Sequence, residues 1–346
     1  MAQAIALIVG CDGRISGLNR LNGVERDCAD MFSMWQNVPQ GRALSKKNEE
    51  PLLNAQASRE AVLGRIKEAQ LTLKEEGSLF FFYYSGHGSE QRETANDEDR
   101  DENDGIDEML CTSDSNRKWI RDDELFALWT GFQKGVRIVM IADCCSAGTN
   151  ARNAVPIDVA AKATRTVQNL TRSPSQNAVA AVKATEGIPH DLLPALPPKN
   201  GAPRAFRMGL GTNTGKGLGI TRSINSRDAA IHPRVSLDSD VSRVDGLHAS
   251  LLHIGACRDS RFSNEVQGSQ GIFTAVLASV IGGAATNRQL YDLVNDKVVA
   301  QTKNFSDPRA RQQPEMHLYG PFKEFLRMQK PFDLSSDWPP LKSWTK

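Results

Sequence analysis

An unbroken run of apolar and aromatic residues, Leu79–Tyr84 (LFFFYY), constrains the fold of this chain more than any other feature. A strand with one face in water alternates polar and apolar residues, whereas a strand covered on both faces is apolar throughout. The run ends in Ser-Gly, as a central strand of a parallel sheet would. Val136–Ala142 (VRIVMIA) has a similar character. We therefore predict two buried strands.

Helix patterns lie between these strand patterns. Ala4–Val9 is a further short apolar run. Asn22 then begins a predicted helix, with Glu25 three residues on as its capping partner. Two more helices are predicted over 58–74 and 122–129. Strand–helix alternation of this kind indicates an α/β fold around a parallel sheet.

The character of the chain changes after residue 148. From 149 to 246 it is rich in Ala, Pro, Asn, Gly, Ser and Thr, and Phe206 is its only aromatic residue. Such a composition cannot bury much apolar surface, so we predict a flexible linker or insertion. Regular structure then resumes: a buried strand and two helices are predicted over 249–256, 272–281 and 286–299.

Composition and charge exclude several classes of protein. The formal net charge is +1, so nothing predicts a nucleic-acid or membrane partner. No run approaches the ~20 apolar residues of a membrane span. The first residues, MAQAIALIVGCDG, lack a basic region and turn polar by Asp12, so they predict a buried strand rather than a signal peptide. The six cysteines have neither disulfide-framework nor zinc-site spacing, so we expect reduced thiols and a cytoplasmic protein.

Reactive side chains follow both apolar strands. His87 lies between two glycines just beyond the first strand, and Asp143, Cys144 and Cys145 follow the second. Catalytic groups collect beyond the carboxyl ends of parallel strands, and a Cys and a His brought together there form an activated nucleophile–base pair. The glycines beside His87 leave backbone amides available for an oxyanion.

These motifs resemble those of metacaspases and of their bacterial relatives, the orthocaspases. YSGHG and DCCSAG are similar to the family's paired motifs, as are the segments LNGVERDCADM and DGIDEMLCTSD. SLLHIGACRDSRFSNE and GIFTAVL resemble the family's small-subunit strand and helix. Cys145 follows His87 by 58 residues, close to the roughly 50 of caspases. The resemblance covers residues 5–148 and 251–299, and it implies a three-layer α/β/α caspase-like fold around a mostly parallel sheet.

The resemblance also implies a division of the chain. Residues 1–148 match the large-subunit (p20-like) catalytic portion and 247–320 the small-subunit (p10-like) portion. Between them, 149–246 would be a flexible processing linker or insertion, and 321–346 would be a C-terminal tail. A zymogen that cuts itself in this linker is the expected organisation.

Carried over residue by residue, the resemblance assigns a catalytic pair. Cys145 matches the nucleophile and His87 the general acid–base, so hydrolysis would pass through a thioester on Cys145. The amides of Gly88 and Cys145 would form the oxyanion hole. Cys144 is expected to be a packing residue. The implied activity is that of a cysteine endopeptidase.

The resemblance further implies an acidic S1 pocket. Asp27, Asp143 and the hydroxyl of Ser85 match residues that select Arg or Lys at P1. Paired carboxylates favour a guanidinium through charge-assisted, bidentate hydrogen bonds. The expected partners are therefore proteins or peptides with Arg or Lys at P1, the chain's own linker among them. The chain departs from the family pattern at Val24 and Arg26, which bear on the shape of the pocket.

Calcium is the one activator that the resemblance suggests. Asp107, Asp122 and Asp123 match the family's Ca²⁺-binding carboxylates, but Arg152 stands where a fourth carboxylate is expected. A cation there opposes a site that needs several oxygen ligands. We expect no required cofactor and weak or absent Ca²⁺ dependence. Asp122 and Asp123 also begin a predicted helix, where capping explains them equally well.

Structural readings compete with the catalytic ones. Cys145 could be a buried structural thiol and His87 a turn residue. Asp27 could serve only the dipole of its helix, and Asp143 could cap a loop. The main alternative function is a caspase-fold scaffold or regulatory protein that binds partners without turnover. A third is another thiol-dependent hydrolase or transferase acting on small molecules, and no cofactor motif favours it.

Overall fold

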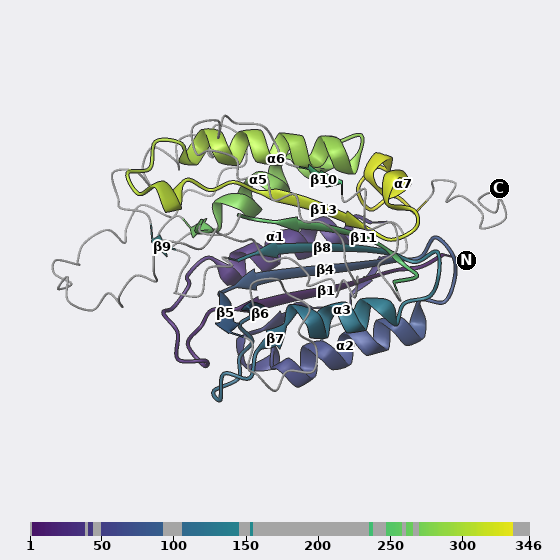
Figure 1. The fold of residues 1–346 in the computed structure, drawn as a ribbon, viewed down its shortest axis with the longest axis horizontal. Coiled ribbons are helices and arrows are strands. Elements are labelled where there is room, and N and C mark those ends of the chain that lie inside the picture. Colours follow the sequence, from purple (N-terminus) through teal and green to yellow (C-terminus); the bar gives the residue numbers. More distant parts are fainter. Residues whose placement is uncertain are drawn as a thin grey trace, which may run out of the picture.

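A central sheet with helices on both faces forms the body of the chain (Figure 1). The computed structural model describes residues 2–38, 41–43, 50–92, 106–144, 153–154, 235–237, 247–257, 261–265 and 270–334. Within these ranges the strand order of the main sheet is β10-β13-β11-β8-β4-β1-β2, and β3 also pairs with β1. Most of the predicted linker, and the tail beyond residue 334, lie outside the described residues.

Four parallel strands make the centre of the sheet: β1 (Ala4–Cys11), β4 (Leu79–Gly86), β8 (Arg137–Asp143) and β11 (Ser250–Gly255). The next strand, β13 (Glu315–Tyr319), runs antiparallel to β11. Strands from the two ends of the chain therefore share one sheet. The predicted mostly parallel α/β sheet is confirmed.

Shorter strands extend and flank this centre. The remaining strands of the main sheet are β2 (Gly41–Ala43), β3 (Leu52–Leu53) and β10 (Val235–Leu237). A separate three-stranded sheet contains β5 (Gly88–Arg92), β6 (Ile106–Leu110) and β7 (Ile120–Arg121). A two-stranded sheet pairs β9 (Asn153–Ala154) with β12 (Asn264–Glu265).

Two helical layers cover the main sheet. One core contains side chains of α1 (Val24–Gln36), α5 (Ile272–Val280), α6 (Asn287–Thr302) and α7 (Lys323–Met328). The other contains side chains of α2 (Arg59–Thr72) and α3 (Asp122–Thr130). Figure 1 shows α2 and α3 below the sheet and α5, α6 and α7 above it. Short 3₁₀ turns occupy Asn54–Gln56, Ile281–Gly283 and Pro308–Ala310. No helix in the described ranges has the length and apolar character needed to span a bilayer.

The aromatic run of β4 is fully buried because both of its faces are covered. Trp35 of α1 stacks on Phe81 with ring centroids 5.6 Å apart. On the opposite face Trp129 of α3 lies 5.9 Å from Phe80 and 5.8 Å from Phe82. Successive residues of a strand point to opposite faces, so a strand between two helical layers needs an apolar residue at every position.

The start of α1 is capped differently from the prediction. Gly23 is the N-cap, and no side-chain bond from the predicted Asn22–Glu25 pair caps the helix. The carboxylate of Glu265 accepts from the backbone N–H groups of Asn22 (3.0 Å) and Gly23 (2.9 Å) instead. Glu25 accepts a bond from Asn54. The capping group comes from the other end of the chain, so a local pattern could not identify it.

Arg137 attaches the beginning of the predicted tail to the sheet. Its guanidinium donates to the carbonyl of Gly77, to Oε1 of Gln329 (2.9 Å) and to the carbonyl of Asp333 (2.7 Å). Burial lowers the pKa of Arg137 to about 10, so the group stays charged at neutral pH. The described part of the tail is therefore held against the first residue of β8.

A pair of histidines lies across β11 and β13. His253 is opposite His317, and their rings stack with centroids 5.9 Å apart. Burial, together with the neighbouring His317, lowers the pKa of His253 to about 3. His253 is therefore a neutral core residue.

Acid should destabilise the chain through His253. An unfolded histidine binds a proton near pH 6.5, whereas folded His253 does so only near pH 3. The contribution of His253 to the free energy of unfolding is therefore complete above pH 6.5 and is lost as the pH falls towards 3. Between about pH 7 and about pH 4.5 the free energy of unfolding of His253→Leu should fall by about 2 kcal/mol less than that of the wild type. Urea denaturation at the two pH values measures this. The exposed His248→Gln variant serves as control, and equal falls in all three proteins would contradict the prediction.

Candidate active site

His87 lies directly beyond β4 with its ring held by a backbone carbonyl. It is 2% exposed, and its Nε2 is 2.7 Å from the carbonyl oxygen of Asn19. A carbonyl can only accept, so Nε2 carries a proton in this arrangement. In the neutral ring the lone pair then belongs to Nδ1. His87 is thus fixed in the tautomer that offers Nδ1 as a base.

The backbone of His87 is fixed as well. The hydroxyl of Tyr84 lies 2.7 Å from the His87 carbonyl and 3.0 Å from that of Cys111. The N–H of Cys111 also donates to the His87 carbonyl, at 3.0 Å. A Cβ on Gly86 would collide with the Tyr84 hydroxyl, so the first glycine of the GHG motif makes room for this contact.

Gly13 allows the loop after β1 to approach His87. Its φ of +88° lies in the left-handed region that favours glycine. A Cβ here would lie 2.7 Å from the carbonyl oxygen of Asn19 and 2.9 Å from Cδ2 of His87. Neither Gly13 nor Asn19 was predicted from the sequence as part of the site. The Asp-Gly pair at 12–13 was a turn signal, but it does not reveal what the turn approaches.

The side chains of Asp27 and Ser85 lie together in the structure. The Ser85 hydroxyl donates to Oδ2 of Asp27 at 2.9 Å, and the N–H of Gly271 donates to Oδ1 at 2.9 Å. Asp27 is 0% exposed. Ser85 is also the sheet partner of Asp143 on β8. The three predicted pocket residues therefore form one buried cluster.

Asp143 has its own pair of hydroxyl donors. Ser263 donates to Oδ1 and Thr274 to Oδ2, each at 2.5 Å. Thr274 is in turn 2.6 Å from the hydroxyl of Tyr83. Burial raises the pKa of Tyr83 well above its usual range, and the charges of Asp27 and Asp143 add to this, so the phenol keeps its proton. No sequence motif predicted Ser263, Gly271, Thr274 or Tyr83 as site residues.

The segment that carries Ser263 is anchored by a buried glutamine. Gln312 donates through Nε2 to the carbonyl of Ala256 (3.0 Å) and to Oγ of Ser263 (3.4 Å). Its Oε1 accepts from the N–H of Asn264. Nearby, the thiol of Cys257 is 3.5 Å from the carbonyl oxygen of Cys144. Residues of the C-terminal half thus surround the end of β8.

Several predicted site residues are only partly described. Cys145 and Arg152 lie outside the described residues. Gly88 begins β5 and is buried, and Asp122 is buried in the first turn of α3. The backbones of Asp107 and Asp123 are described but their side chains are not. Among the side chains that are described, no group of three His, Cys, Asp or Glu is arranged to hold a metal ion.

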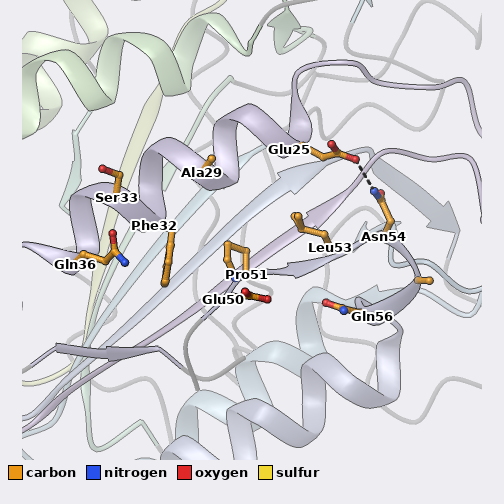
Figure 2. Close-up of a pocket in the computed structure, with 11 residues that line it drawn as sticks. Glu25, Ala29, Phe32, Ser33, Gln36, Glu50, Pro51, Leu53, Asn54 and Gln56 are labelled. Atoms are coloured by element: carbon orange, nitrogen blue, oxygen red, sulfur yellow. Dashed lines mark hydrogen bonds between the residues drawn. The ribbon is translucent and has the colours of Figure 1, made fainter. Parts of the chain in front are cut away.

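A cavity of about 600 Å³ lies away from this cluster, between α1 and the segment 50–56 (Figure 2). Phe32 and Leu53 line it, and the hydrogen bond from Asn54 to Glu25 lies at one end. Its lining includes none of His87, Asp27 and Asp143. This cavity is therefore not the predicted pocket.

Residues 5–152, which contain both His87 and Cys145, match the family model of the metacaspase, peptidase C14 domain. This part of the chain is similar to the metacaspase peptidase C14 domain. The chain is 35% identical to Metacaspase-3 of Trypanosoma cruzi over 75 residues, and this match covers 21% of this chain and 20% of that protein. It is 38% identical to Metacaspase III c of Phaeodactylum tricornutum over 82 residues, and this match covers 23% of each protein. The chain thus spans about a fifth of the length of these relatives.

A solved structure shares the fold of this chain. Protein GSU0716 from Geobacter sulfurreducens has a TM-score of 0.56, and the match covers 96% of this chain and 100% of that one. The sequences are 22% identical, so the likeness concerns the fold alone. The shared fold agrees with the predicted α/β architecture.

Replacing Gly13 should destabilise the fold, whereas replacing the exposed Gly64 should not. Gly13→Ala combines left-handed backbone with contacts of 2.7 and 2.9 Å to Asn19 and His87, so we expect a loss of at least about 1–2 kcal/mol in the free energy of unfolding. Gly64→Ala, on an exposed helix position with nothing within 4 Å, should instead gain about 0.5–1 kcal/mol. Urea denaturation of both variants measures the difference. A Gly13→Ala protein as stable as the wild type would contradict the close approach of loop and histidine.

Proposed function

We propose that this chain is a cysteine endopeptidase that cleaves peptide bonds after Arg or Lys. The observation that carries the proposal is the buried cluster of Asp27, Ser85 and Asp143. In sequence, Ser85 is two residues before His87 and Asp143 is two residues before Cys145. Asp27, Ser85 and Asp143 all lie within residues 5–152, which match the metacaspase family model. The peptidase activity and its preference at P1 are proposed from the cluster and the family match together.

Strand register supports the proposed dyad. Ser85 and Asp143 are partners across β4 and β8, and each strand ends within one residue of that pair. His87 and Cys145 follow these partners by the same number of residues. Two parallel strands that end together present the residues beyond them at one edge of the sheet.

The proposed chemistry follows from the tautomer of His87. Nδ1 takes the proton of the Cys145 thiol, and the thiolate attacks the scissile carbonyl carbon. The N–H groups of Gly88 and Cys145 stabilise the resulting oxyanion. The imidazolium returns the proton to the leaving amine, which gives a thioester on Cys145, and water then hydrolyses the thioester with His87 as base. The Asn19 carbonyl would stabilise the imidazolium through Nε2.

Charge supports the proposed preference at P1. Asp27 and Asp143 are both 0% exposed, and buried carboxylates need compensation by hydrogen bonds or by a cation. An Arg or Lys side chain would supply that cation. A neutral P1 residue would bring no cation to the two carboxylates, and an acidic one would add a third negative charge.

We propose that hydrolysis requires no cofactor and depends weakly, if at all, on Ca²⁺. Arg152 stands where the family pattern has a carboxylate, and a cation there opposes Ca²⁺ binding. Asp122 lies in the first turn of α3, where a carboxylate already interacts favourably with the helix dipole.

A cytoplasmic location is also proposed. Five cysteines are described as free thiols, and all of them are buried. Burial raises the pKa of one of them, Cys11, to about 12, which keeps its thiol protonated and unreactive. Buried free thiols are typical of proteins from reducing compartments.

Replacing the two adjacent cysteines should separate nucleophile from packing residue. Cys145→Ala should lower kcat/KM by about 10³-fold or more, because a covalent mechanism loses its nucleophile, whereas Cys144→Ala should retain most activity. Fluorogenic peptides that differ only at P1 measure this, with Ca²⁺ or a chelator added. Arg and Lys should be cleaved and Asp should not, with little effect of the chelator.

Equal activity of the two cysteine variants would contradict the assignment of the nucleophile. Efficient cleavage after Asp would contradict the acidic pocket. No turnover of any peptide by the wild type, with specific binding of a partner protein, would favour the scaffold alternative.

Self-processing is the last part of the proposed function. The predicted linker carries basic residues at Arg165, Arg172, Lys183, Arg204, Arg207, Arg222 and Arg227. A tethered segment meets its own active site at high effective concentration, so a peptidase specific for Arg or Lys should cut it. We expect purified wild type to show two or more fragments on a denaturing gel, and Cys145→Ala to stay at full length.

The fragments should nevertheless stay together under native conditions. β8 and β11 pair over their length, and Arg137 binds Gln329 and Asp333 from the other half. Gel filtration of the processed protein should therefore give one peak of unchanged size. An intact linker in active enzyme, by mass spectrometry, would contradict self-processing, and so would identical fragments in Cys145→Ala.

A further inference from the structure

Three hydroxyl and carboxylate groups form a chain of hydrogen bonds behind the proposed pocket. Tyr83 is 2.6 Å from Thr274, and Thr274 is 2.5 Å from Oδ2 of Asp143. Tyr83 and Thr274 are both 0% exposed. Tyr83 belongs to β4 of the N-terminal half, and Thr274 is the third residue of α5 in the C-terminal half.

The direction of donation in this chain follows from the acceptor at its end. A carboxylate accepts, so the single hydroxyl proton of Thr274 must point to Asp143. The oxygen of Thr274 then accepts from Tyr83. The phenol is able to donate because burial and the nearby negative charges raise the pKa of Tyr83 and keep it protonated.

Both oxygens of Asp143 therefore have a fixed donor. Ser263 holds Oδ1 and Thr274 holds Oδ2, each at 2.5 Å. One donor on a carboxylate leaves it able to turn about its Cβ–Cγ bond, whereas two donors on different oxygens fix its plane. Since a carboxylate offers about four lone-pair directions, the two bonds orient its charge without using up its capacity.

We propose that Thr274, held by Tyr83, is a positioning residue that fixes the plane of Asp143 and thereby sets a preference for Arg over Lys at P1. This inference rests on the proposed function. A guanidinium is planar and needs carboxylate oxygens in matching orientation for its paired bonds. An ammonium group is a compact charge with rotatable donors, so it depends much less on the plane of the carboxylate. Loosening Asp143 should therefore weaken Arg substrates more than Lys substrates.

The pattern of the sequence agrees with such a role. Thr274 interrupts an otherwise apolar stretch at the start of α5, IFTAVL, and Tyr83 ends its side chain in a hydroxyl within the aromatic run LFFFYY. A polar atom in an apolar core costs free energy unless it is hydrogen-bonded. Here the two hydroxyls satisfy each other and carry the bond to Asp143.

The test compares kcat/KM for two peptides that differ only in Arg or Lys at P1. Thr274→Val keeps the shape of the side chain and removes the hydroxyl. We expect it to lower the Arg/Lys ratio of kcat/KM about tenfold, mainly through KM of the Arg peptide. Tyr83→Phe should lower the ratio less, and Thr274→Ser should restore it. Tyr291→Phe is the matched control, because its buried hydroxyl bonds to the carbonyl of Pro314, and it should leave the ratio unchanged.

Each outcome separates this inference from the proposed function. If the wild type cleaves both peptides and Thr274→Val loses both activities equally, or keeps the wild-type ratio, the positioning role is overturned and the peptidase activity stands. If the wild type cleaves neither peptide, the proposed function itself is overturned. Thermal unfolding checks the fold of each variant. Should Thr274→Val not fold, Tyr83→Phe decides: an unchanged ratio overturns the inference, and a lowered one supports it.

Discussion

Parallel pairing of β4 with β8 is the constraint on which the rest of the site depends. It places Ser85 opposite Asp143, and Ser85 in turn bonds Asp27 on α1. The two carboxylates are therefore buried at the same edge of the sheet at which β4 leads into His87. A slip of one residue in this pairing would turn Ser85 or Asp143 to the other face of the sheet. The register of β4 and β8 thus determines where the site residues lie.

The positions of the buried strands could be predicted because the residue pattern of each strand is a local signal. A strand with helices on both faces needs an apolar residue at every position, and Leu79–Tyr84 shows this directly in sequence. His87 and Asp143 follow such strands, so their place at the edge of the sheet could be predicted too. The pocket role of Asp27 could not be predicted from periodicity, since an acidic residue near a helix start has an ordinary explanation; the family resemblance supplied it.

Contacts between distant parts of the chain left no comparable signal. Glu265 caps α1 from 242 residues away, and the local Asn22–Glu25 pattern predicted a cap that does not form. Asn19 reaches His87 only because Gly13 turns the loop with φ of +88°. Every residue has a backbone carbonyl, so no sequence motif can identify the one that contacts His87. Thr274 did leave a trace, as a lone hydroxyl in an apolar helix segment.

Apolar contacts and hydrogen bonds have different roles at the junction between the two halves. Phe273 of α5 lies in the same core as Met31 of α1, and β11 pairs with β8, so burial of apolar surface holds the halves together. A hydrogen bond formed on folding contributes only about 1 kcal/mol net, but a buried donor or acceptor left without one costs about 1–3 kcal/mol. The bonds that Ser263, Gly271 and Thr274 make to the two carboxylates therefore contribute little to the association of the halves. Their main effect is to orient the carboxylates. Because apolar packing keeps the halves docked, a cut in the linker can leave the geometry of the pocket unchanged.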